Sequence, residues 1–224
     1  MNLLKKLIQH NWLAILYLNF RMLPIRQAIH LPIDIYHKIR FVSLKGRIVL
    51  DTPACWRGMV KMGTQGAELF SLNNETILDI RGDLIIKGRF ISGIGTCIRV
   101  DDNASMVMGN DVIIGGLNLL FCSDRIELGE GFLSSWKCQI MDTDTHPIID
   151  RMSRQEKPYI SSVHIGEHTW LCNGATINKG TRIPANTIVA SHSLCNRDYT
   201  SEGTNCVLAG VPAKVVARDK SWRI

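Results

Sequence analysis

The chain carries two different hydrophobic patterns. In residues 1–40, apolar side chains recur at spacings of three and four residues while polar ones lie off that face, as in an amphipathic helix. The apolar positions are Leu4, Leu7, Ile8, Trp12, Ile15 and Leu16, and the polar ones are Lys5, Lys6 and Gln9. From about Gly46 the helical period is lost, and short β-branched runs alternate with Gly, Asn and Asp. This texture predicts closely spaced short strands.

A six-residue repeat dominates the C-terminal half. Large aliphatic residues stand at every sixth position, and a small residue follows each of them four positions later. The aliphatic residues are Ile165, Leu171, Ile177, Ile183 and Val189, and the small ones are Thr169, Ala175, Thr181, Thr187 and Ser193. Neither a helix nor an ordinary strand has this period. It predicts a coil of three short flat segments per turn, about 18 residues long, whose successive turns stack as parallel strands.

The same repeat is looser upstream and is interrupted once. Aliphatic positions keep step at Met108, Ile114 and Leu120 and resume after a two-residue slip at Leu128, Ser134 and Ile140, with Gly109, Gly115 and Gly129 at expected corners. Ile80 and Ile86 indicate that the coils begin earlier still. Between His146 and His164 the segment is polar, charged and proline-bearing, which predicts a loop that leaves the coil. Long loops on regular scaffolds are commonly functional.

These patterns predict three parts. Residues 1–45 form a helical, basic N-terminal arm, residues 46–212 form a parallel β-helix with a loop at 147–164, and residues 213–224 form a C-terminal tail. The arm has two interpretations. It caps the first coil, because the end of a solenoid must be covered, or it also rests on an anionic membrane surface. We favour the cap.

Charge is distributed unevenly between these parts. The whole chain has a net charge of +6, yet residues 1–47 hold eight basic residues and one acidic residue, and the remainder holds 18 basic and 19 acidic residues. A neutral body without a recognition motif argues against nucleic acid as a partner. The uninterrupted apolar run from Trp12 to Leu18 is too short for a transmembrane helix, which needs about 20 residues.

Cysteine usage bears on the compartment. Seven cysteines occur without a C-x-x-C pair. An odd number without a recognisable cleavable signal favours reduced thiols over a disulfide framework. We therefore expect a cytoplasmic protein, with peripheral contact at the inner membrane face if the arm binds lipid.

Several motifs resemble a known family. Residues 164–193, HIGEHTWLCNGATINKGTRIPANTIVASHS, and residues 209–218, AGVPAKVVAR, are similar to the hexapeptide-repeat acyltransferases. Residues 142–147, DTDTHP, with the loop behind them, resemble the galactoside and maltose O-acetyltransferase branch. Residues 19–33, NFRMLPIRQAIHLPI, are similar to the leader of capsular and exopolysaccharide acetyltransferases.

The resemblance implies an all-β solenoid with a left-handed parallel β-helix, a homotrimer, and acetyl-CoA as the co-substrate without a metal. The hand comes from the resemblance alone, because parallel crossovers are right-handed in about 98% of cases. The implied function is O-acetylation of a sugar hydroxyl in cell-surface or capsular polysaccharide biosynthesis.

The resemblance also assigns chemistry to single residues. His146 matches the family's catalytic histidine, and a neutral imidazole is suited to deprotonate a hydroxyl near neutral pH. Asp144 and Asp142 either orient that imidazole or contact the sugar, or they only fix the bend into the loop. The residues expected at the CoA thioester are Trp170, Ser191, Asn196, Arg197, Lys214 and Arg218. Of these, Lys214 and Arg218 would meet phosphates.

The chain departs from the family pattern at two corners. Trp170-Leu171-Cys172 stands where the family usually has W-I-G, and Ala190-Ser191-His192-Ser193 stands where it has a glycine-rich corner.

Three alternative functions stay open: N-acetylation of an amino sugar, a zinc hydratase resembling gamma-type carbonic anhydrases, and a non-catalytic scaffold. The hydratase would need three histidines around one zinc ion, and the available candidates are His146, His164, His168 and His192.

Overall fold

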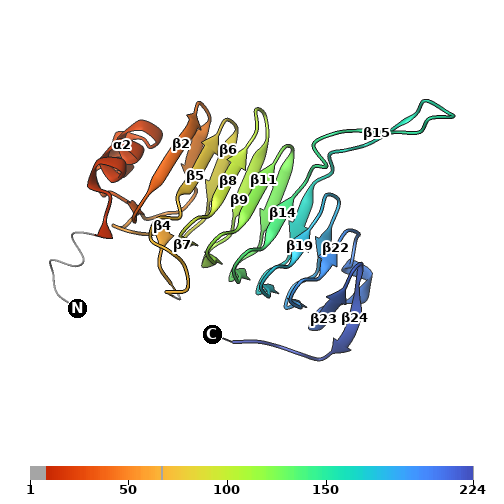
Figure 1. Ribbon diagram of the computed structural model, residues 1–224. Helices are drawn as coiled ribbons and strands as arrows, with labels where there is room; N and C mark the ends of the chain where they lie inside the picture. Colours follow the sequence, from red (N-terminus) through yellow and green to blue (C-terminus); the bar gives the residue numbers. More distant parts are fainter. Residues whose placement is uncertain (1–8, 67, 224) are drawn as a thin grey trace.

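Three sheets, parallel except for the last strand of the first one, form the faces of a left-handed solenoid in the computed structural model, which describes residues 9–66 and 68–223 (Figure 1). The first sheet contains β1 (Ile33–Ile35), β4 (Val60–Thr64), β7 (Phe90–Gly93), β10 (Val112–Ile114), β13 (Leu133–Ser134), β18 (Trp170–Leu171), β21 (Ile188–Val189), β23 (Cys206–Gly210) and β24 (Ala213–Arg218). The second contains β2 (Ile39–Leu44), β5 (Thr76–Ile80), β8 (Cys97–Val100), β11 (Leu119–Cys122), β14 (Gln139–Met141), β19 (Thr176–Ile177) and β22 (Leu194–Cys195). The third contains β3 (Arg47–Leu50), β6 (Asp83–Ile86), β9 (Ser105–Met108), β12 (Arg125–Leu128), β17 (Val163–Ile165) and β20 (Arg182–Ile183).

The predicted stacking of aliphatic side chains is confirmed. Ile165 pairs with Ile183 in the third sheet and Leu171 with Val189 in the first, each 18 positions apart. All five aliphatic residues of the repeat are buried, and so are the five small residues between them. Each turn therefore presents one aliphatic side chain per face to a narrow interior, and a small residue fits where the chain bends.

Turns upstream of the loop are longer than the predicted 18 residues. Met108 pairs with Leu128, 20 positions later, and Ile86 pairs with Met108, 22 positions later. The two residues by which the repeat is shifted lie in the corner between β11 and β12. They lengthen this corner, and the inward aliphatic residues of successive turns still pair in register. Extra length is tolerated there because corners face solvent and the core does not change.

The corners require glycine because the backbone of the next turn packs directly against them. A Cβ on Gly109 would lie 2.6 Å from the backbone nitrogen of Glu130, and one on Gly129 would lie 2.4 Å from that of Glu167. Such separations are shorter than van der Waals contact, so these corners stack only without a side chain.

The solenoid begins earlier than the sequence patterns indicate. Strands β1 and β2 form two faces of the first turn, and both precede residue 46. The aliphatic-plus-small signature does not extend to them, because β2 alternates half-buried and exposed residues instead. Residues 213–218 form strand β24, antiparallel to β23, where a tail was expected.

Two helices, α2 (Trp12–Met22) and α3 (Ile25–Ala28), cover the N-terminal end of the solenoid (Figure 1). Asn19 is fully buried between α2 and β1. Its amide nitrogen donates to the carbonyl oxygens of Ile15 and Ile33, both at 2.8 Å, and its oxygen accepts from the Ile33 N–H at 3.1 Å. One side chain thus satisfies both backbone groups of Ile33 at the outer edge of the first strand, where they would otherwise be unpaired.

The buried face of α2 differs from the predicted one. Ala14, Ile15, Leu18 and Asn19 are buried, whereas Leu16, predicted on the apolar face, is 46% exposed. Packing against β1 selects the face that can bury Asn19, and periodicity alone does not reveal that choice. Leu4, Leu7 and Ile8 lie outside the described residues. No helix in the described ranges is both long and apolar enough to cross a bilayer.

We predict that Asn19→Leu destabilises the fold by about 3 kcal/mol, because the Ile33 N–H and carbonyl both lose their buried partner. Urea unfolding followed by circular dichroism measures this loss. Leu13→Ala, on the exposed side of the same helix, serves as the control and should change stability by less than about 0.5 kcal/mol. Equal stability of Asn19→Leu and Leu13→Ala would contradict the capping role.

Candidate functional site

A two-stranded hairpin leaves the solenoid at the corner between the second and third sheets. Its strands are β15 (Ile148–Ile149) and β16 (Glu156–Lys157), and it projects well beyond the solenoid (Figure 1). Lys179, from the same corner one turn later, holds its base. The Lys179 ammonium pairs with Asp144 at 2.8 Å and donates to the carbonyl oxygen of Pro158. The segments that lead into and out of the hairpin are therefore both bonded to one residue of the coil.

His146 lies at this base, two residues after Asp144, and its side chain is exposed. In the described part of the chain its ring has no hydrogen bond or ion pair. A backbone hydrogen bond from the Asp144 N–H to the Tyr159 carbonyl, 2.8 Å long, closes the hairpin just before it. The imidazole is thus held on a fixed corner with both ring nitrogens open to a bound molecule.

The two aspartates of the motif are engaged elsewhere. Asp142 is fully buried, and its carboxylate accepts from the backbone N–H groups of Ser123 at 2.7 Å and Asp124 at 2.8 Å. Burial and the nearby Asp142 carboxylate raise the pKa of the Cys122 thiol, which stays protonated beside it. Asp144 pairs with Lys179. The structure does not bring either carboxylate into hydrogen-bond contact with His146.

Four of the six residues expected at the thioester line one hollow of about 460 Å³ at the C-terminal end: Asn196, Arg197, Lys214 and Arg218. Glu202 also lines it, and its carboxylate accepts hydrogen bonds from Arg197 at 3.0 Å and from Arg218 at 3.1 Å. These hydrogen bonds, first that of Arg197, lower the pKa of Glu202. With three basic side chains and one carboxylate, the hollow keeps a net positive charge suited to phosphate.

Trp170 and Ser191 do not line that hollow. Trp170 lies in β18, and its indole N–H donates to the Ser135 hydroxyl at 3.1 Å. The ring of Trp222, near the C-terminus, lies 6.0 Å from that of Trp170 and stacks on His168 at 4.5 Å. The returning C-terminal segment therefore packs beside Trp170, a contact that spacing along the sequence does not indicate.

The two unusual corners are accommodated by neighbouring turns. His192 has a positive φ of 57° and its ring lies over Gly174, where a Cβ would be 2.5 Å from the imidazole. Ser191 donates to Asn173 at 2.8 Å. Cys172 is half-buried, and burial raises the pKa of its thiol. These side chains fill the corner that glycine leaves open in the family pattern.

The candidate zinc histidines do not converge. His164 pairs with Glu127 at 2.7 Å, His168 stacks on Trp222, and His192 lies over Gly174. Over residues 9–66 and 68–223, no three His, Cys, Asp or Glu side chains are grouped as metal ligands. Within one copy of the chain, these three histidines therefore do not form the three-histidine site of a gamma-type hydratase.

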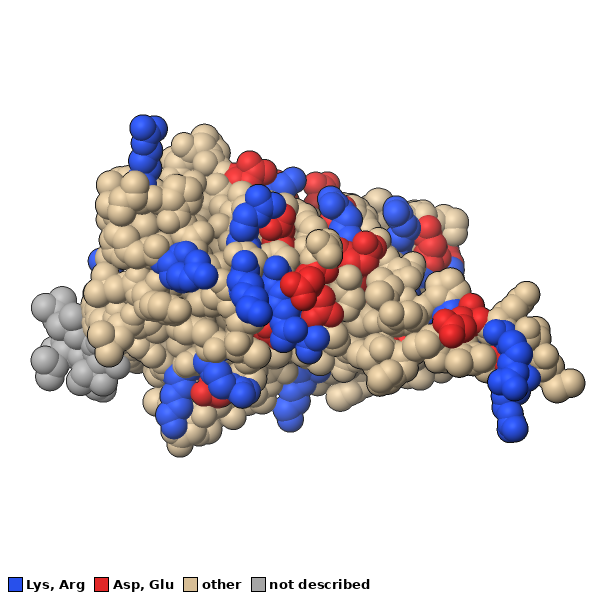
Figure 2. Space-filling model, turned by 90° about the horizontal axis from the view of Figure 1, so that it is seen from above, with Lys and Arg blue, Asp and Glu red and all other residues tan. Residues whose placement is uncertain are grey.

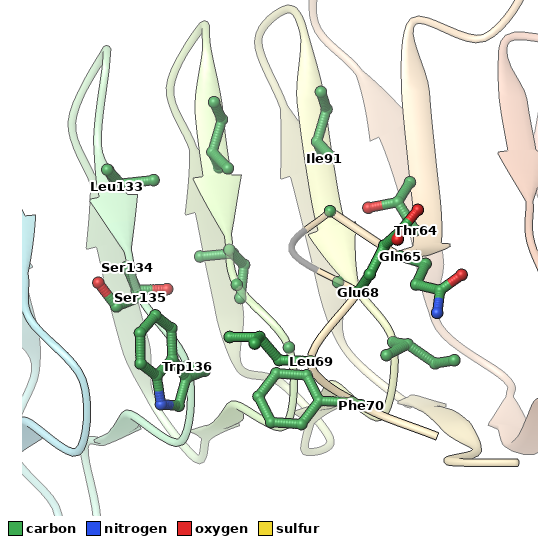
Figure 3. A pocket seen from close by; sticks show the side chains of 17 residues that line it. Thr64, Gln65, Glu68, Leu69, Phe70, Ile91, Leu133, Ser134, Ser135 and Trp136 are labelled. Carbon is green, nitrogen blue, oxygen red and sulfur yellow. The ribbon is translucent and has the colours of Figure 1, made fainter. Parts of the chain in front are cut away.

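Two hollows were not anticipated from the sequence. One is a polar cleft of about 580 Å³ beside the hairpin base. The other is an apolar recess of about 470 Å³ on the first sheet, lined among others by Leu69, Phe70, Ile91, Leu133 and Trp136 (Figure 3). Phe70 and Trp136 lie at one end of this recess. The six-residue repeat describes inward positions, whereas most residues that line the two hollows lie at outward strand positions, at corners or in loops. The signal that could have found them is the outward column of each face.

Comparison with known proteins extends this description. No family model matches the chain. It is 30% identical over 155 residues to the "Uncharacterized 24.8 kDa protein in cps region" of Klebsiella pneumoniae, covering 68% of this chain and 67% of that one. It is 26% identical over 121 residues to the galactoside O-acetyltransferase of Lactococcus lactis, covering 54% of this chain and half of that one.

Among solved structures, the polysialic acid O-acetyltransferase OatWY shares the fold, with a TM-score of 0.57, 21% identity, and coverage of 84% of this chain and 92% of that one. The stacked turns, the buried aliphatic repeat and the projecting hairpin thus occur together with sequence similarity to acetyltransferases. Homologues of this chain are acetyltransferases of the hexapeptide-repeat family, and one solved O-acetyltransferase shares its fold.

Proposed function

We propose that the protein is an acetyl-CoA-dependent O-acetyltransferase that modifies a sugar hydroxyl in cell-surface or capsular polysaccharide biosynthesis. Sequence similarity to acetyltransferases supports acetyl transfer, and the galactoside O-acetyltransferase relative supports a sugar as the acceptor. The relative from a cps region is in keeping with a role in capsule formation. The single observation that carries the proposal is the exposed, unpaired imidazole of His146 on the hairpin base that Lys179 fixes.

In this mechanism His146 acts as the general base. Its imidazole removes the proton of the acceptor hydroxyl while that oxygen attacks the thioester carbonyl of acetyl-CoA. A carbon–oxygen bond forms, the carbon–sulfur bond breaks, and the proton passes to the departing thiolate. An alcohol is a poor nucleophile until its proton is removed, and a positioned base contributes about 10²- to 10⁴-fold.

The C-terminal hollow supports a binding role for the donor. The guanidinium carbon of Arg197 lies over the Tyr199 ring, 4.2 Å from its centroid, and Glu202 accepts a hydrogen bond from the same group, so the guanidinium is already oriented. Lys214 is exposed at the rim and forms no ion pair within the described ranges. We assign these two residues and Arg218 to the phosphates of CoA, with Trp170 and Ser191 further along the same donor.

Association into a homotrimer is part of the proposal. An outward column of half-buried apolar side chains runs along the first sheet in strict register: Ile91, Ile113, Leu133, Trp170 and Ile188. The apolar recess lies on the same sheet. An apolar face of this kind favours packing against other copies of the chain, which would place Trp170 at the boundary between copies.

Peripheral membrane contact is proposed for the outer side of the N-terminal cap. Leu13 is 83% exposed, and Phe20, Ile25 and Ile29 are also exposed large apolar residues. Arg21 and Arg26 lie on the same two short helices. Apolar and basic side chains on one surface element suit the interface of an anionic bilayer.

We predict that His146→Ala lowers kcat for acetyl transfer to a saccharide by about 10²- to 10⁴-fold, because the hydroxyl loses its base. Release of free CoA in the presence of acceptor measures this rate. His30→Ala removes an exposed histidine on the N-terminal cap and should retain wild-type activity. Equal rates for the wild type and His146→Ala would contradict the mechanism.

We further predict that Lys214→Gln raises KM for acetyl-CoA about tenfold with little change in kcat, because one charge-assisted contact to phosphate is lost. The difference should shrink as ionic strength rises. Lys220→Gln, outside the hollow, provides the matched control. An unchanged KM for Lys214→Gln would exclude Lys214 from the donor site.

A further inference from the structure

Helix α2 carries apolar side chains on two opposite faces. One face packs against β1 and is buried. The other is exposed, follows the spacing i, i+3, i+4, i+7 and is here called the outer stripe; it consists of Leu13, Leu16, Tyr17 and Phe20. A surface helix normally turns polar residues outward, and a helix that is apolar all round is normally buried. The outer stripe is therefore suited to a partner that covers it.

The charges beside the outer stripe are basic. In the sequence, residues 1–33 contain no Asp or Glu, and their cationic residues are Lys5, Lys6, Arg21 and Arg26. Arg21 lies in the last turn of α2, Arg26 lies on α3, and both are exposed. Neither arginine forms an ion pair with another described residue. Unpaired arginines next to large apolar side chains match an anionic bilayer, where headgroups take the charge and acyl chains cover the stripe.

The flanks of the solenoid have a different character. Their arginines are paired with nearby carboxylates: Arg47 with Asp83, Arg81 with Asp79, Arg99 with Asp101, and Arg125 with Glu127. Seen from above, blue and red side chains alternate along the solenoid, whereas the end that carries α2 is largely tan (Figure 2). Charges of both signs side by side attract an anionic surface only weakly. The capped end is therefore better suited to a membrane than a flank.

A solenoid that stands on its capped end holds His146 at a fixed height. Helix α2 lies beyond β1, the outermost strand of the first sheet. In the second sheet, β14, the strand that leads to His146, is the fifth counted from that end. Four strand spacings amount to about 19 Å and a helix to about 10 Å, so the imidazole stands about 30 Å above the lipid.

The proposed donor site lies at the opposite end of the solenoid. Arg197, Lys214 and Arg218 line the hollow there, far from α2 (Figure 1). Docking through the outer stripe therefore leaves this hollow open to the solution, from which a charged, soluble co-substrate arrives. A saccharide attached to the membrane reaches His146 from the other side. Attachment raises its effective concentration at the base when its length matches the height of the base.

We infer that the protein stands on an anionic membrane through α2 and α3 and acetylates a saccharide attached to that membrane, at a sugar about 30 Å above the headgroups. The acceptor class rests on the proposed function for its chemistry, whereas the orientation on the membrane does not depend on turnover. The outer stripe is assigned to lipid, so a protein partner or a second copy at this surface is incompatible with the assignment.

Sedimentation of the full chain with vesicles tests the docking. The vesicles contain phosphatidylcholine alone or an equimolar mixture with phosphatidylglycerol. We expect at least about tenfold tighter binding to the anionic vesicles at low salt, and less difference as ionic strength rises. The double variant Leu13→Asp, Phe20→Asp should weaken that binding at least about tenfold, because carboxylates meet the bilayer. Met152→Asp changes a 94% exposed side chain on the hairpin and should bind as the wild type does.

The height is tested with galactosyl-serine at the outer end of lipid-anchored polyproline peptides in the same anionic vesicles. Spacers of about 9 Å and about 31 Å are made from three and ten prolines, at about 3.1 Å per residue. We expect CoA release from acetyl-CoA to be at least about tenfold faster with the longer spacer. It should also exceed the release with the same peptide without its lipid.

Equal binding to both kinds of vesicle, unchanged binding of the double variant, or equal CoA release with the two spacers would each overturn the inference. Self-association in solution that the double variant abolishes would also overturn it, because the stripe would then belong to a second copy. Vesicle binding without CoA release from any galactosyl acceptor, free or anchored, would contradict the proposed function alone. Release with a free galactoside and no gain from anchoring would contradict the membrane-attached acceptor alone.

Discussion

The close stacking of one turn of backbone on the next is the constraint on which the rest of the molecule depends. Inward aliphatic side chains such as Ile165 and Ile183 fill a narrow prism, and small residues such as Thr181 fit at its bends. Each buried aliphatic side chain contributes about 1.5–3 kcal/mol. Because the interior is completely filled, chemistry can be built only on outward positions and at corners.

That division explains where the candidate site lies. The hairpin base lies at the corner between the second and third sheets, where Lys179 forms its ion pair with Asp144. Arg99 and Asp101, which line the polar cleft and hydrogen bond with each other, lie on a strand that leads into that corner and at the corner itself. Rigid parallel pairing keeps these corners in register, so residues far apart in sequence meet without a flexible connection. Asp142 illustrates the dependence, since its buried carboxylate serves the preceding turn at Ser123 and Asp124. The exposed His146 therefore keeps its position because the buried Asp142 carboxylate holds the backbone just before it.

The repeat made most of the solenoid predictable, because inward side chains obey a strict spatial rule that the sequence displays directly. The same spacing does not predict which residues stand at outward positions or what they contact. It could not show that Trp222 returns to stack on His168, that Asn19 closes the edge of β1, or that Arg99 and Asp101 share a cleft with the hairpin. The first turn was missed for a related reason, since β2 alternates exposed and half-buried residues and lacks the signature of later turns. The left-handed sense of the coil was expected only from the resemblance to hexapeptide-repeat acyltransferases, because parallel crossover connections are generally right-handed.

The bond formed in the product tests the central claim, transfer of acetyl to a sugar hydroxyl, most directly. Purified protein would be incubated with isotopically labelled acetyl-CoA and a neutral galactoside, and the product examined by NMR before and after mild alkali. The account predicts one labelled acetyl group on the sugar, attached as an ester that alkali removes. An alkali-stable amide formed on an amino sugar in preference to the galactoside, or CoA released without any acetylated sugar, would contradict it.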